Sequence, residues 1–164
     1  MSSVSIDDLL GAAEERTGLT DWGDDWFRLP LAAWVDDLGS DHLNEAGRSF
    51  FTSLAVRDLC RRLEVIDTLQ RHPEIDDVTI PPIVYVTGTI RSGTTLFHNV
   101  MSLHAGAKSL RRWELMEPVP PPEQATADTD PRIARVQASI DKRRGTPLES
   151  MHWVNADEPE ECQW

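Results

Sequence analysis

The chain has 164 residues, with 28 acidic and 16 basic side chains and a formal net charge of −12. This length suffices for a domain with its own core, and the acidic balance disfavours non-specific binding to nucleic acid. The two cysteines, Cys60 and Cys162, indicate neither a disulfide framework nor a metal site, and neither a signal peptide nor a run of membrane-spanning length is found, so we expect a cytoplasmic protein.

Helical periodicity dominates the N-terminal region. Ser5 is a suitable N-cap for a first helix that Gly18 ends. A short helix is predicted over residues 31–38. A long helix, capped by Asn44, is predicted to run to about residue 70, since apolar residues recur there every three or four positions. We expect residues 1–77 to form a helical region that packs on the core of residues 78–164.

A turn-rich segment, residues 20–30, separates the first two predicted helices. It carries the aromatic residues Trp22, Trp26 and Phe27. Because aromatic side chains are mostly buried, we expect these three to pack in a core. The alternative is that they line a pocket for a substrate.

The sequence from residue 83 onward is typical of a strand, a loop and a helix in succession. Residues 83–87 are a run of apolar and β-branched residues, residues 88–93 are bounded by glycines, and residues 94–103 have a helical apolar stripe. A proline-rich loop over residues 118–130 and a helix over residues 131–144 follow. The predicted fold class is α/β, with a P-loop-like parallel sheet flanked by helices, and incomplete because few further strands are found.

The glycine-bounded loop has the spacing of a phosphate-binding loop. Gly88 and Gly93 match the glycines of G-x-x-x-x-G-K-[ST], but Thr94 occupies the lysine position and the cation of the loop is Arg91. Loop amides and the positive end of the following helix would meet at one anion. The missing lysine argues against one possible function, that of a kinase-like protein that binds a nucleoside triphosphate.

The run from Thr87 to Leu96, Thr-Gly-Thr-Ile-Arg-Ser-Gly-Thr-Thr-Leu, resembles the 5′-phosphosulfate-binding loop of sulfotransferases. The sequence on both sides of this run resembles the bacterial branch of that family, although Ile90 occupies a position where many members have proline. The resemblance implies a transferase that uses 3′-phosphoadenosine 5′-phosphosulfate without a metal. It assigns the following residues to the donor site: Gly88, Arg91, Ser92, Gly93, Thr94 and Thr95. The implied acceptor is a small molecule, lipid or glycan bearing a hydroxyl or amine.

A general base must accept the proton of the acceptor. The resemblance favours Glu114, and a surface ion pair of Glu114 with a neighbouring arginine is the alternative. His152 is the second candidate, because histidine titrates in the useful range. The acidic residues Glu158, Glu160 and Glu161 are expected in the first turn of a helix.

The resemblance also implies that residues holding the donor's 3′-phosphate lie beyond Trp164, so we expect an N-terminal part of a sulfotransferase. A catalytically inactive fragment that binds a nucleotide or a partner is therefore an alternative function. An incomplete sheet would favour self-association through its unpaired edge.

Overall fold

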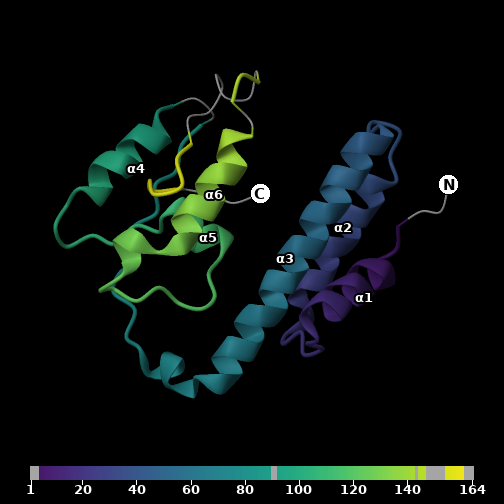
Figure 1. The fold of residues 1–164 in the computed structure, drawn as a ribbon, viewed down its shortest axis with the longest axis horizontal. Coiled ribbons are helices and arrows are strands. Elements are labelled where there is room, and N and C mark those ends of the chain that lie inside the picture. The colour runs from purple at the N-terminus through teal and green to yellow at the C-terminus, as the bar shows by residue number, and fades with distance from the viewer. Residues whose placement is uncertain (1–3, 90–91, 143, 147–153, 161–164) are drawn as a thin grey trace. The chain divides into compact units, whose positions relative to one another are not determined.

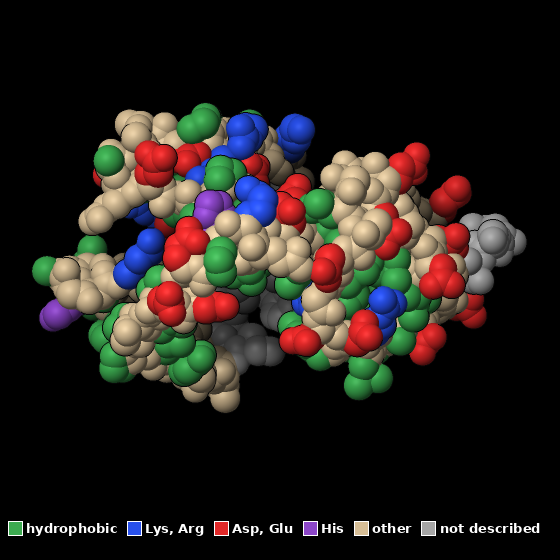
Figure 2. Space-filling model, turned by 90° about the horizontal axis from the view of Figure 1, so that it is seen from below, with side chains coloured by type: hydrophobic (Ala, Val, Ile, Leu, Met, Phe, Trp, Pro, Cys, Tyr) green, Lys and Arg blue, Asp and Glu red, His purple; other side chains and the backbone are tan. Residues whose placement is uncertain are grey.

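A computed structural model describes residues 4–89, 92–142, 144–146 and 154–160. The chain divides into two compact units, with the division between Val78 and Thr79 (Figure 1). Carboxylates are scattered over the visible face, with apolar side chains between them, instead of gathering in one patch (Figure 2). Among the helices searched in the described residues, none combines the length and hydropathy that crossing a membrane requires.

The described residues of the N-terminal unit, 4–78, form three α-helices and two short 3-10 helices. The α-helices are α1 (Ile6–Thr17), α2 (Arg28–Leu38) and α3 (Glu45–Arg71), and the 3-10 helices are η1 (Asp25–Phe27) and η2 (Pro73–Asp77). The predicted caps are confirmed, since Ser5 accepts from the Asp8 amide and Asn44 from the Gly47 amide. Each of these bonds satisfies an amide that the first helical turn leaves without a partner.

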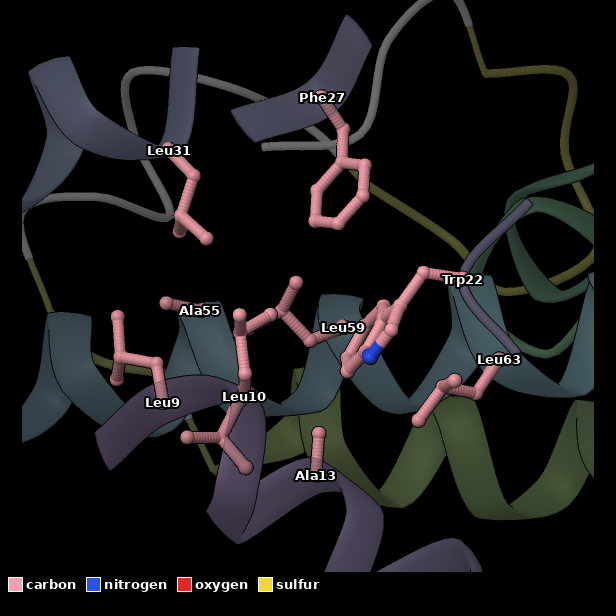
Figure 3. Packing of buried hydrophobic residues seen from close by; sticks show 10 residues of the cluster. Leu9, Leu10, Ala13, Trp22, Phe27, Leu31, Ala55, Leu59 and Leu63 are labelled. Atoms are coloured by element: carbon pink, nitrogen blue, oxygen red, sulfur yellow. The ribbon is translucent and has the colours of Figure 1, made fainter. Parts of the chain in front are cut away.

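The core of this unit lies between α1, α2 and α3 (Figure 3). Leu9 and Ala13 of α1 and Leu63 of α3 are almost completely buried. Trp22 and Phe27 are also buried, and their rings stack with centroids 5.4 Å apart. Core packing is therefore confirmed for these two aromatics, whereas Trp26 is exposed.

The aromatic segment is held to α3 by Arg62. Its guanidinium donates to the Trp22 carbonyl at 3.0 Å and to the Asp24 carbonyl at 2.7 Å, and lies 4.3 Å from the centroid of the Phe27 ring. Because these carbonyls belong to a turn without a helical ladder, Arg62 supplies donors that the backbone there lacks.

The C-terminal unit contains α4 (Thr94–Ser102), α5 (Arg112–Met116), the 3-10 turn η3 (Ala127–Thr129) and α6 (Pro131–Asp141). The segment 154–160 runs beside residues 110–113. The amides of Arg112 and Trp113 donate to the carbonyls of Glu158 and Ala156, each at 3.0 Å. An isolated antiparallel bridge joins Arg111 to Pro159.

The predicted parallel sheet is wrong for the described part of the chain, which contains no strand. Residues 83–87 have no assigned secondary structure, and Ile83, Val84 and Tyr85 are 62%, 71% and 79% exposed. A strand is defined by the ladder that it forms with a neighbour. No described segment pairs with residues 83–87, so a sequence with strong strand propensity remains outside any sheet.

A small second core consists of Trp113, Val136, Ile140 and Ala156. The Trp113 side chain at its centre is completely buried. Arg132 of α6 lies over the Trp113 ring at 4.7 Å from its centroid. The same guanidinium binds both carboxylate oxygens of Asp130 and donates to the carbonyls of Glu117 and Pro120 at 2.7 and 2.6 Å. This one side chain therefore joins α5, α6 and the loop between them.

We expect the Arg132–Asp130 pair to make the stability of the C-terminal unit depend on pH in the acid range. The hydrogen bond from Arg132 lowers the pKa of Asp130 from 3.8 to about 2. The contribution of this carboxylate to stability is present above pH 4 and is lost as the pH falls toward 2, since the unfolded chain then binds the proton more readily. Asp130→Asn preserves an N-cap acceptor for α6 but removes the charge.

Urea unfolding at pH 5, 3 and 2 tests this expectation. The difference in unfolding free energy between the wild-type chain and Asp130→Asn should shrink as the pH falls. A difference that stays constant over this range would show that the carboxylate has the same pKa in the folded and unfolded chain.

Candidate functional site

The glycine-bounded loop packs closely on itself. A Cβ atom at Gly88 would lie 2.5 Å from Ser92 Oγ and 3.0 Å from Thr94 Cγ2, so no other side chain fits there without displacement. The Ser92 amide donates to the Thr89 carbonyl at 3.1 Å, which closes a turn. Gly93 has a φ of 89°, a left-handed conformation that favours glycine, and is the N-cap of α4.

The loop therefore leads directly into the N-terminus of α4. The first hydrogen bond of the helix runs from the Phe97 amide to the Gly93 carbonyl at 3.0 Å. The amides of the first turn, including those of Thr94 and Thr95, have no acceptor within the helix itself. They form the positive end of the helix dipole. Such a helix start after a tight glycine loop is suited to binding a phosphate. The predicted cation, Arg91, lies outside the described residues.

Gly88→Ala should weaken binding of a phosphate-bearing ligand at the loop by about tenfold or more, because the Ser92 hydroxyl and the Thr94 methyl group must move to admit the added methyl group. Gly11→Ala is a matched control, since no atom lies within 4 Å of a Cβ at Gly11 in the middle of α1. The dissociation constant for 3′-phosphoadenosine 5′-phosphate, measured by calorimetry, checks this expectation. Equal affinities of the two variants would contradict it.

Glu114 is placed at the start of α5 and is only 7% exposed. Its Oε2 atom accepts a hydrogen bond from the Arg111 amide at 2.7 Å, so the side chain caps the helix. The Lys108 ammonium lies 3.6 Å from the Oε1 atom. A carboxylate has about four lone-pair positions, so one bond to an amide leaves room for a further donor.

A pocket of about 680 Å³ opens beside this carboxylate. Its polar lining includes Lys108, Arg111, Gln124, Asp128 and Asp157, in addition to Glu114. Ser102, the last residue of α4, also lines the pocket. The pocket therefore extends to the C-terminal end of α4.

The arginines beside Glu114 have other partners. The guanidinium of Arg111 joins Asp128 at 2.7 Å and Asp157 at 2.9 Å, and its bond with Asp128 is the main cause that raises the Arg111 pKa. Arg112 forms an ion pair with Glu160, which is buried. The alternative of a surface pair between Glu114 and the side chain of Arg111 or Arg112 is thus wrong, and Lys108 is the described cation within ion-pair distance of Glu114.

The helix expected at the acidic C-terminal residues is absent from the described part, where Glu158 is in a bend, Pro159 is in a bridge and Glu160 has no assigned secondary structure. Glu161 and the second candidate base, His152, lie outside the described residues. Sequence reasoning did not find Lys108, Asp128 and Asp157 as neighbours of Glu114. Their separation along the chain, with no shared motif, left no signal that would have brought them together.

Comparison with known proteins shows one family over the C-terminal half of the chain and similar folds over nearly all of it. The sulfotransferase family matches residues 82–164. The fold is similar to that of the sulfotransferase STF9 from Mycobacterium avium, with 30% identity and a TM-score of 0.85 over 98% of this chain and 42% of that protein. It is also similar to that of STF1 from Mycobacterium tuberculosis H37Rv, with 24% identity and a TM-score of 0.79 over 96% of this chain and 45% of that protein.

The chain thus spans less than half of the length of these two solved structures. A search of the curated proteins found no match.

Proposed function

Because the chain belongs to the sulfotransferase family, we propose that it binds 3′-phosphoadenosine 5′-phosphosulfate and transfers the sulfuryl group to a hydroxyl or amine. The observation that carries this proposal is the loop from Gly88 to Gly93 at the start of α4. There a glycine with no room for a Cβ atom in the observed side-chain arrangement is followed by a left-handed glycine at the N-terminus of a helix, which fits the 5′-phosphate end of such a donor.

Each residue of the loop has a role in this proposal. The amides of Thr94 and Thr95 bind the anionic oxygens, and Ser92 contributes a hydroxyl donor. Arg91 binds the 5′-phosphate and stabilises charge that develops on the leaving oxygen. The donor, when bound, supplies the sulfuryl group, and the chain needs no divalent cation to bind it.

We assign the general base to Glu114. In the balanced reaction, the acceptor oxygen or nitrogen bonds to sulfur, the bridging S–O bond of the donor breaks, and the acceptor proton passes to the Glu114 carboxylate. The pocket beside this carboxylate leaves space for an acceptor. His152 remains the second candidate for this role, and a cytoplasmic location remains part of the proposal.

Calorimetric titration of the chain with 3′-phosphoadenosine 5′-phosphate, with ATP as the comparison ligand, tests the donor site. We expect tighter binding of the bisphosphate, weakened about tenfold or more by Arg91→Ala, since a hydrogen bond to a charged group contributes about 1.5–3 kcal/mol. Arg57→Ala is the control, because Arg57 is an arginine of α3 bound to the adjacent Asp58. Preference for ATP would favour the kinase-like alternative and overturn the proposal.

The second candidate function is an inactive protein that binds a nucleotide or a partner. Bisphosphate binding without any transfer of a labelled sulfuryl group to a panel of hydroxyl and amine acceptors would select it. Transfer that Arg91→Ala abolishes would exclude it.

A further inference from the structure

The pocket beside Glu114 offers both hydrogen-bond donors and acceptors. The hydroxyl of Ser109 and the amide of Gln124 line it, and neither side chain bonds to any described residue. Asp128 and Asp157 each use Oδ1 to bind Arg111, and in the described part of the chain their Oδ2 atoms accept no hydrogen bond. The wall therefore mixes free donors with free acceptors.

The charges of this pocket nearly cancel. Two cations, Lys108 and Arg111, face three carboxylates, those of Glu114, Asp128 and Asp157. Arg111 is already bound by two of these carboxylates, and Lys108 lies near the third. An anionic ligand would find no uncompensated cation here, and an apolar ligand would strip water from polar groups without replacing its hydrogen bonds.

A hydroxyl group both donates and accepts a hydrogen bond, so a molecule with several hydroxyls complements such a wall. We propose that this pocket receives a neutral, polyhydroxylated acceptor of the saccharide class, and that Ser109 and Gln124 bind its hydroxyls. This inference rests on the proposed function, since it names the acceptor of the same site. It narrows the range of acceptors from lipid, small molecule or glycan to the last of these.

Ligand-observed saturation-transfer NMR on the whole chain tests the proposal with three probes. Maltotriose is the neutral saccharide, trigalacturonate is an anionic one of equal length, and p-cresol is an apolar hydroxyl compound. We expect maltotriose to bind, at least about tenfold more tightly than either other probe. The double variant Ser109→Ala/Gln124→Ala should weaken maltotriose binding about tenfold, because it removes the free hydroxyl and amide groups.

Ser53→Ala is the matched control, since Ser53 is an exposed serine of α3 that bonds only to the Ser49 carbonyl of its own helix. Absent maltotriose binding, tighter binding of trigalacturonate or p-cresol, or equal affinity of the double variant and the control would each overturn the inference. Bisphosphate titration of the same samples separates the two proposals. If the bisphosphate binds and maltotriose does not, only the acceptor class is wrong, and if maltotriose alone binds, the donor site is wrong.

Discussion

Glu114→Gln is expected to lower the rate of sulfuryl transfer by about 10²–10⁴-fold while leaving the fold intact, because general-base catalysis contributes rate factors of that size. Glutamine replaces the carboxylate with an amide that cannot accept a proton at neutral pH. It still presents an oxygen to the Arg111 amide, and glutamine is as suitable as glutamate at this capping position. The variant therefore separates the chemical role of Glu114 from its structural role.

The matched variant is Glu114→Ala, which removes both the base and the cap. It should lose activity to the same extent as Glu114→Gln and should also lose about 1 kcal/mol of stability, the typical contribution of a capping bond. Release of the bisphosphate product measures activity, and urea unfolding measures stability. If Glu114→Gln retained wild-type activity, the base would have to be another residue, and His152→Ala would then be the variant to examine.

Trp113→Ala should destabilise the C-terminal unit by about 3–5 kcal/mol, the usual cost of truncating a buried tryptophan. The indole is completely buried, and its loss would remove both its packing on Val136 and the ring beneath Arg132. Amide hydrogen exchange reports the unfolding free energy of each unit separately, so the N-terminal unit provides an internal reference.

Trp26→Ala is the control for this change, since Trp26 is 70% exposed and should cost less than about 1 kcal/mol. If Trp113→Ala fails to fold, Trp113→Phe retains an aromatic ring beneath Arg132 and should show an intermediate loss. A change of less than about 1 kcal/mol in Trp113→Ala would contradict the assignment of this residue as the centre of the second core.

Features coded within a few residues of each other were predictable. The caps at Ser5 and Asn44, and with them the starts of α1 and α3, follow from side chains adjacent to the backbone groups that they satisfy. The turn from Gly88 to Gly93 before α4 also followed from local glycine spacing. The donor-site assignment of these residues is still a prediction, because placing a helix start does not identify its ligand.

Features that depend on distant partners were not predictable. Residues 83–87 have the composition of a strand, yet strand formation needs a neighbour that composition does not reveal. The same holds for the buried pair of Arg112 with Glu160 and for the contacts of Arg132 with Trp113 and the Glu117 carbonyl. From sequence alone an arginine is expected on the surface, because the acceptors for its five N–H donors are known only once the fold is known.

The central claim is that the loop before α4 binds the nucleotide donor. Two-dimensional 15N NMR of the chain during titration with 3′-phosphoadenosine 5′-phosphate tests it most directly, because it identifies the amides that bind. The account predicts saturable shifts of the Gly88, Ser92, Gly93, Thr94 and Thr95 amides, and unchanged amides in the middle of α1. Absent shifts at the loop, or shifts confined to the N-terminal unit, would contradict it.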